Sequence, residues 1–262
     1  EAAAAELMEA LLWTAEHDPD YDLKLKACEC WTTLCENDEG IADRVLKPYL
    51  SRLTLALLNG MVYSEDELTA LEEEQEKNSQ QDVNPALMPQ ADGSSRGTIQ
   101  DEDEGGGVEW TLRKCSASGL DRIATRYKQD VVDALLPHIQ AKLRDEDWKV
   151  QESAVLAMGA LQEGCEEGLI ARNYLDDFLK HLITVMLPAP QPFLRSITCW
   201  TLSRYAKYVA RQQSQLSDNA PGHLLEPMVS GFLNCMRDNS TKVQEAAASA
   251  MCGLEEEARV EE

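Results

Sequence analysis

The residue types best suited to recognition chemistry lie between Pro192 and Ala210, in the segment PFLRSITCWTLSRYAKYVA. Ile197, Trp200 and Arg204 are spaced three and four residues apart, so a helix places them in one row. Such a pair of tryptophan and arginine can bind a peptide, because the indole packs against apolar or aromatic side chains and the guanidinium holds carbonyls or a chain terminus. The other interpretation is that Trp200 is a core residue between two helix layers.

The whole segment is predicted to form one helix from Pro192 to Ala210. Proline is tolerated at the first helical position, and apolar residues follow it at helical spacing. These residues make the expected core stripe: Leu194, Leu202, Tyr205 and Val209. The row that contains Trp200 lies at the edge of this stripe.

Charge and composition limit the classes to which this chain of 262 residues can belong. It carries 47 acidic and 24 basic residues, and the net charge of −23 argues against nucleic-acid binding and favours a basic partner, although a merely soluble acidic protein also explains part of the excess. Hydrophobic residues make up 44%, and long Ala-, Leu-, Glu- and Lys-rich segments favour an all-α fold. No apolar run reaches membrane-spanning length, so we expect no membrane contact. The chain opens in mid-pattern with EAAAAELMEALL and has no signal-like segment there, so we expect a piece cut from a longer protein.

The residues that most often carry catalysis are scattered along the chain. None of the four histidines lies in a recognisable catalytic or metal-ligand motif: His17, His138, His181 and His223. Gly105–Gly107 follows an acidic run and not a strand, so it does not resemble a phosphate-binding loop. The eight cysteines form no CxxC pair and are expected to be reduced core residues. We therefore expect neither an enzyme nor a cofactor nor a metal site.

Helical periodicity recurs along most of the chain. Pro48 is expected to kink the third helix or to mark where its main part begins. The predicted helices span Ala3–His17, Leu23–Cys35, Ile41–Met61, Trp110–Tyr127, Asp130–Arg144, Trp148–Glu163, Tyr174–Met186, Phe193–Ala210, Leu224–Arg237 and Thr241–Arg259.

Every second helix opens with a similar pattern. It begins with Leu or Val, continues with Lys, Arg or Gln, and soon becomes small or apolar, in Leu25–Trp31, Leu112–Ser118, Val150–Leu156, Leu194–Trp200 and Val243–Ser249. A repeat of about 40 to 50 residues built from two helices is typical of HEAT repeats. We therefore predict a right-handed α-solenoid, a single array of about five helix pairs over residues 1–262.

An acidic, polar segment at 64–109 interrupts this pattern. It contains EEEQEKNSQQD and QDEDEGGG and has too little apolar content to fold by itself. Once it is removed, the spacing from Leu25 to Leu112 fits the same repeat. We therefore predict a disordered loop inserted within the second repeat, between its two helices.

Equivalent positions of successive repeats line up along one surface of a solenoid. At the seventh place of the motif, Ser118, Leu156 and Trp200 follow one another, and Asp121 lies three residues beyond Ser118. With Asp121 and Glu256 as acidic ends, such a groove would complement an extended basic peptide with an aromatic anchor. The alternative is that this stripe packs against the first helices of the repeats.

Four segments closely resemble the transportin family, which belongs to the importin-β superfamily of nuclear import receptors. They are WTLRKCSASGLD at 110–121, DWKVQESAVLAMGALQEGC at 147–165, RSITCWTLSRYA at 195–206 and KVQEAAASAMCGLEEEA at 242–258. The resemblance covers essentially the whole chain, including the acidic insert. It implies binding of cargo whose nuclear localisation signal is basic and ends in Pro-Tyr.

Carried over by position, the resemblance also implies the site residues. The Pro-Tyr end would meet Trp200 and Arg204, and Glu256 would meet a basic residue of the signal. Four further residues would lie beside the Pro-Tyr end: Ile197, Leu156, Asp121 and Ser118, the last of which is an alanine in the family.

The same resemblance implies regulation and further partners. The family's acidic loop couples binding of the GTPase Ran to cargo release, and its most charged part here would be Asp101, Glu102, Asp103 and Glu104. Ran would bind mostly through repeats absent from this chain, and nucleoporins are further expected partners. The protein would shuttle between cytoplasm and nucleus.

Two other functions remain compatible with the pattern. A general HEAT scaffold for complex assembly, without import activity, would explain the helix pairs but not the insert or RSITCWTLSRYA. The second is that the chain is a truncated or divergent product that binds no cargo alone.

Overall fold

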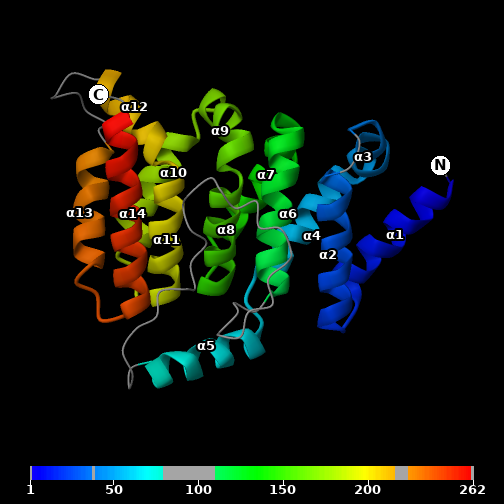
Figure 1. The fold of residues 1–262 in the computed structure, drawn as a ribbon, viewed down its shortest axis with the longest axis horizontal. Helices are drawn as coiled ribbons and strands as arrows, with labels where there is room; N and C mark the ends of the chain where they lie inside the picture. The colour runs from blue at the N-terminus through cyan, green and yellow to red at the C-terminus, as the bar shows by residue number, and fades with distance from the viewer. Residues whose placement is uncertain (1, 37–38, 79–109, 216–223, 261–262) are drawn as a thin grey trace. The chain divides into compact units, whose positions relative to one another are not determined.

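The computed structural model describes residues 2–36, 39–78, 110–215 and 224–260 (Figure 1). The described part consists of helices and their connections, without a strand. The helices are α1 (Ala2–His17), α2 (Tyr21–Glu36), α3 (Glu39–Leu46), α4 (Leu50–Gly60), α5 (Glu65–Asn78), α6 (Leu112–Tyr127), α7 (Gln129–Lys142), α8 (Trp148–Ala160), α9 (Gln162–Ala171), α10 (Leu175–His181), α11 (Pro192–Arg204), α12 (Ala206–Gln215), α13 (Leu225–Cys235) and α14 (Thr241–Val260). A 3₁₀ turn at Lys47–Tyr49 precedes α4, and a π-helical turn at Leu182–Met186 follows α10.

The chain divides into two compact units, which are described separately. Unit 1 contains residues 1–63 and 111–182, and unit 2 contains 64–110 and 183–262. The single array over 1–262 remains a prediction.

Unit 1 is built around α6, which packs against α2, α4, α8 and α9. Its core includes Trp31, Leu57 and Ile123, each fully buried. Helices α6 and α9 approach so closely that a Cβ on Gly164 would lie 2.2 Å from the backbone of Ala124. The close approach explains why a residue of low helix propensity occupies this helical position.

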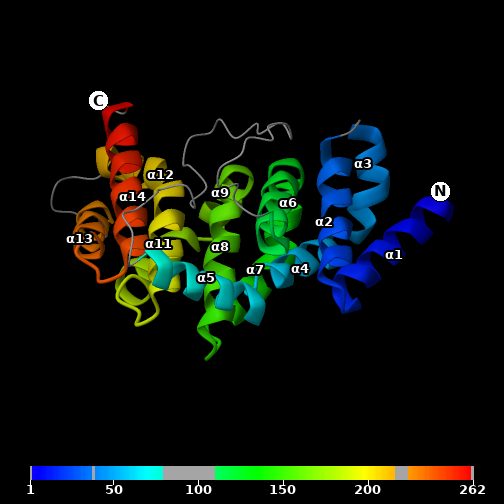
Figure 2. The same ribbon diagram turned by 60° about the horizontal axis from the view of Figure 1, so that its bottom comes forward.

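Unit 2 is built around α14, which packs against α11, α12 and α13. Helices α11 and α14 lie side by side in both ribbon views (Figures 1 and 2). The predicted core stripe is confirmed, because all four of its residues are buried: Leu194, Leu202, Tyr205 and Val209. Phe232 of α13 and Val243 of α14 are also fully buried.

The predicted break at Pro48 is confirmed, since this residue lies in the 3₁₀ turn between α3 and α4. The prediction of one helix from Pro192 to Ala210 is wrong, because α11 ends at Arg204 and α12 begins at Ala206. The Tyr205 N–H donates to the Leu202 carbonyl at 3.1 Å, a 3₁₀-type bond that tightens the last turn. The prediction also missed α9, which continues beyond Glu163 to Ala171.

The prediction that 64–109 is an unfolded loop is wrong for its first part, because Glu65–Asn78 forms α5. Ser64 and Glu67 make a capping box: the Glu67 N–H donates to Ser64 Oγ at 3.1 Å, and the Ser64 N–H donates to Glu67 Oε2 at 2.9 Å. Acidic residues in the first turn also favour the helix through its dipole. Residues 79–109 lie outside the described part.

Candidate peptide-binding surface

Helix α11 positions three of the predicted site residues in unit 2. Its buried side includes Leu194, Cys199 and Leu202, and the Thr198 hydroxyl donates to the Leu194 carbonyl at 2.6 Å. Ile197 and Trp200 occupy another side of the helix and are half-buried. A half-buried row provides apolar surface that is held in place by the core and is still reachable by a partner.

Trp200 and Arg204 contact each other at the C-terminal end of α11. The Arg204 guanidinium carbon lies 6.0 Å from the centroid of the indole, within the range of a cation–π interaction. Both side chains are half-buried. The two side chains are therefore adjacent, as their spacing predicts, and together they present an apolar ring beside a cation.

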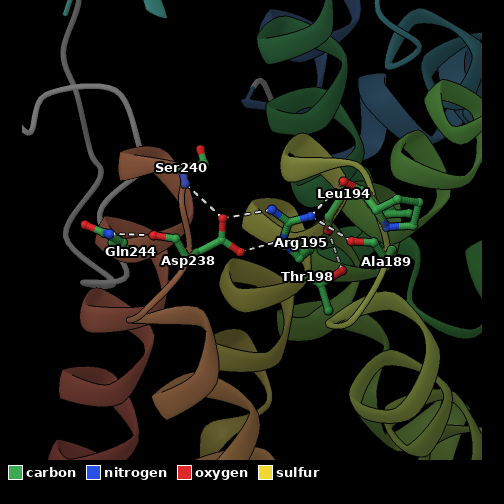
Figure 3. A network of polar contacts seen from close by, with 8 residues as sticks. Ala189, Leu194, Arg195, Thr198, Asp238, Ser240 and Gln244 are labelled. Carbon is green, nitrogen blue, oxygen red and sulfur yellow. Dashed lines mark hydrogen bonds and ion pairs between the residues drawn. The ribbon is translucent and has the colours of Figure 1, made fainter. Parts of the chain in front are cut away.

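An ion pair attaches the other end of α11 to the turn between α13 and α14 (Figure 3). Arg195 Nε and Nη2 donate to the two carboxylate oxygens of Asp238 at 2.7 and 2.8 Å, a bidentate geometry. Arg195 Nη1 also donates to the carbonyls of Ala189 and Pro190 at 2.7 and 2.8 Å. These bonds hold the first turn of α11 to both neighbouring connections.

The electrostatics of Asp238 follow from its partners. Burial by itself raises the pKa of the Asp238 carboxyl, but hydrogen bonds from Arg195 and from the backbone N–H of Ser240 outweigh burial, so the pKa lies below its usual value. The carboxylate therefore stays charged at neutral pH and keeps the bidentate pair intact.

Glu256 is exposed near the end of α14, the helix that packs against α11. Its neighbour Glu255 forms an i,i+4 ion pair with Arg259. Glu256 thus adds negative charge to an exposed part of unit 2.

Unit 1 holds the other three predicted cargo residues. Ser118 and Asp121 lie three residues apart on α6 and are both half-buried. Leu156 lies on α8, which packs against α6, and only 6% of its surface is exposed. Every residue of α8 from Glu152 to Ala160 is buried, so Leu156 presents little surface to a partner.

Asp121 also affects a cysteine of unit 1. Burial raises the pKa of the Cys165 thiol to about 12, and the negative charge of the Asp121 carboxylate contributes in the same direction.

Sequence reasoning missed a buried charged cluster in unit 1. Arg113 Nη1 donates to Glu152 Oε2 at 2.7 Å, Nη2 donates to Oε1, and the Met61 carbonyl accepts a further bond from the guanidinium. The guanidinium carbon lies 4.0 Å from the ring centroid of Tyr63, whose ring is 6.3 Å from that of Trp148. A glutamate at the start of the mostly small and apolar run ESAVLAMGA was the available signal, because a buried carboxylate needs a cation.

Asp101, Glu102, Asp103 and Glu104, the predicted regulatory residues, lie outside the described part of the chain. Within that part, no group of acidic, histidine and cysteine side chains could hold a metal ion. None of the described helices combines the length and apolar character needed to cross a membrane.

Known proteins resemble the chain in sequence and in fold. A model of the HEAT-like repeat matches residues 148–205. Transportin-1 of Mus musculus is 37% identical over 266 residues, covering 93% of this chain and 28% of the relative. Importin subunit beta-2 of Schizosaccharomyces pombe is 34% identical over 281 residues, covering 96% of this chain and 30% of the relative. A solved structure of Kap95p with RanGDP superposes with a TM-score of 0.67 at 17% identity, covering 95% of this chain and 25% of the solved one.

Paired helices, the HEAT-like match and the solved neighbour define the class: the protein is an all-α solenoid of HEAT repeats. Within that class, the chain belongs to the transportin family of the importin-β superfamily. It spans less than a third of the length of these relatives.

Proposed function

We propose that the chain is the part of a nuclear import receptor that binds cargo signals which are basic and end in Pro-Tyr. The observation that carries the proposal is the half-buried Trp200 with Arg204 beside it at the end of α11. The indole offers a surface for the proline and tyrosine rings, and the guanidinium offers donors for the terminal carbonyl groups. Ile197, on the same helix, extends the apolar surface.

Charge supports a basic partner. The chain has a net charge of −23, and Asp121 in unit 1 and Glu256 in unit 2 supply carboxylates at two of the proposed contact positions. Attraction between opposite charges steers the association of two molecules, and this attraction weakens as the salt concentration rises. In this proposal Ser118 and Asp121 of unit 1 contact the signal, and Leu156 contributes only the small exposed part of its side chain.

We further propose that the acidic segment, including Asp101–Glu104, couples Ran binding to cargo release. In the solved neighbour, Kap95p is bound to RanGDP. What supports the placement of the segment inside one repeat is that its flanks meet, since Arg113 stacks on Tyr63. Shuttling between cytoplasm and nucleus, and contact with nucleoporins, belong to the same proposal.

The test is a fluorescence-anisotropy titration of a labelled basic peptide ending in Pro-Tyr. Trp200→Ala is expected to weaken binding by about 2 kcal/mol or more, because buried aromatic anchors dominate peptide interfaces. The matched control is Trp13→Ala, which removes an exposed tryptophan on α1 and should leave the affinity unchanged.

A second peptide, in which the Pro-Tyr end is replaced by Ala-Ala, should lose affinity for the wild-type chain to the same extent. Equal binding of both peptides, or equal loss in both tryptophan variants with unchanged circular dichroism, would overturn the proposed site. A folded chain that binds neither peptide would favour a general HEAT scaffold.

A further inference from the structure

Helices α11 and α14 of unit 2 are joined at their N-terminal ends by two contacts. Arg195 in the first turn of α11 pairs with Asp238, which lies in the turn that leads into α14. The Lys242 ammonium lies 5.9 Å from the ring centroid of Phe193, within the range of a cation–π interaction. Because the two helices also lie side by side (Figures 1 and 2), they run in the same direction.

The contact of Phe193 with Lys242 fixes the register between the two helices. These residues occupy equivalent places, because each directly precedes the repeated motif, which begins at Leu194 and at Val243. Residues seven and eleven positions further along form one row with each of them, since these spacings are close to two and three helical turns. The rows continue with Trp200 and Arg204 on α11 and with Ser249 and Gly253 on α14.

The proposed peptide-binding surface therefore extends from α11 onto α14. Because both helices rise equally per residue, Trp200 lies level with Ser249. Arg204 likewise lies level with Gly253. Ser249 is exposed and the other three residues are half-buried, so a partner can reach this strip. Glu256 follows Gly253 by three residues and is its neighbour on the surface of α14.

Gly253 differs in its surroundings from five further helical glycines. A Cβ on each of those five would lie between 2.2 and 3.1 Å from a neighbouring atom, so close packing explains why a glycine is there. A Cβ on Gly253 would have no neighbouring atom within 4 Å. The five closely packed residues are Gly60, Gly119, Gly164, Gly168 and Gly231.

The helix itself gives no reason for a glycine at this place. Gly253 lies in the interior of α14, where glycine is less favourable than alanine because it loses more backbone entropy on folding. Alanine would improve the helix and would meet no neighbour. What the glycine provides is open space on the surface at the level of Arg204.

We propose that Gly253 determines the shape of the binding surface, because it leaves room for the main chain of the cargo signal to approach α14. This inference rests on the proposed function and adds a residue that determines specificity to the same surface. A main chain that passes close to Gly253 lies between the Arg204 guanidinium and the Glu256 carboxylate, so both charges can reach it. A side chain at this position would fill the space and hold the signal away from both.

The experiment measures stability and binding in the same variants of the whole chain. Gly253→Ala should raise the urea midpoint of unfolding, because alanine has the higher helix propensity. It should also weaken binding of the labelled basic peptide ending in Pro-Tyr, as measured by fluorescence anisotropy. Gly253→Leu should weaken binding further, by about tenfold or more, because the larger side chain overfills a close contact. A purely structural role would not move stability and affinity in opposite directions.

Two further variants serve as controls. Ser230→Leu adds a side chain of the same size at an exposed position of α13 in the same unit, and it should leave the affinity unchanged. Trp200→Ala shows whether the peptide uses the proposed surface. Circular dichroism of each variant shows whether it is folded.

The outcomes separate this inference from the proposed function. If Gly253→Leu is folded and binds as tightly as the wild type while Trp200→Ala loses affinity, the role of Gly253 is wrong and the proposed function stands. A lower urea midpoint for Gly253→Ala would also overturn the inference, because the fold would then need the glycine. A folded wild-type chain that does not bind the peptide would overturn both.

Discussion

Two arginines occupy the same place in the repeated motif and take different partners. Arg113 in unit 1 pairs with Glu152 on another helix, and their side chains are 10% and 1% exposed. Arg195 in unit 2 pairs with Asp238 in a turn, and theirs are 16% and 12% exposed. The first pair is therefore almost withdrawn from water, whereas the second retains some hydration on both sides.

The turns before α8 and α14 are nevertheless built alike. In both, an aspartate Oδ1 accepts the backbone N–H two residues on at 2.9 Å, and a glutamine six residues on donates to the carbonyl of the aspartate. The residues are Asp145, Asp147 and Gln151 in unit 1, and Asp238, Ser240 and Gln244 in unit 2. The repeat thus specifies the turn, but it does not specify the partner of the arginine.

The environment of each arginine explains the difference. Arg113 lies over the ring of Tyr63 and donates to the Met61 carbonyl, both of which immediately precede the inserted segment. Arg195 instead donates to the carbonyls of Ala189 and Pro190 in a proline-rich connection. The residues that flank each connection therefore decide where the guanidinium points.

The largest expected effect is in unit 1. Arg113→Met should lower the free energy of unfolding by about 3–5 kcal/mol, because it leaves the Glu152 carboxylate buried without a cation. Urea denaturation followed by circular dichroism measures the change, with Arg44→Met, which alters an exposed arginine of α3, as the control. The double variant Arg113→Met/Glu152→Met should recover much of the loss; no recovery would show that the cost comes from packing instead.

A smaller effect is expected at the equivalent place in unit 2. Arg195→Met should cost about 1.5–3 kcal/mol, the range for hydrogen bonds to charged groups, because water can reach Asp238. The same denaturation experiment measures it. A loss of unfolding free energy equal to that of Arg113→Met would contradict the view that the difference in burial makes one ion pair more important for stability than the other.

The smallest effect is a dependence on pH. Since the pKa of Asp238 is lowered in the folded protein, its stabilisation is fully present above the unfolded value of about 3.9 and is lost as the pH falls through the folded value. Denaturation midpoints measured between about pH 5 and 2 should fall more steeply for the wild type than for Asp238→Asn. Parallel curves would mean that the stabilisation by the Arg195–Asp238 pair does not depend on the charge of Asp238.

Local signals predicted most of the helices and part of the candidate site. The spacing of Trp200 and Arg204 placed them together, and the structure has their contact at 6.0 Å. A local signal for α5 was also present and was missed, because Ser64 and Glu67 are a capping box. The exposure of Leu156 could not be predicted, since it depends on how the neighbouring helices surround α8.

The sequence by itself determined the repeat, the helix pairs and the row on α11, because helical spacing and capping act within a few residues. Only the tertiary structure decided that Arg113 meets Glu152 and that Arg195 meets Asp238. The partners in these pairs are about 40 residues apart in the sequence. Their meeting depends on which faces the packed helices bury together, and burial then sets the strength of each interaction.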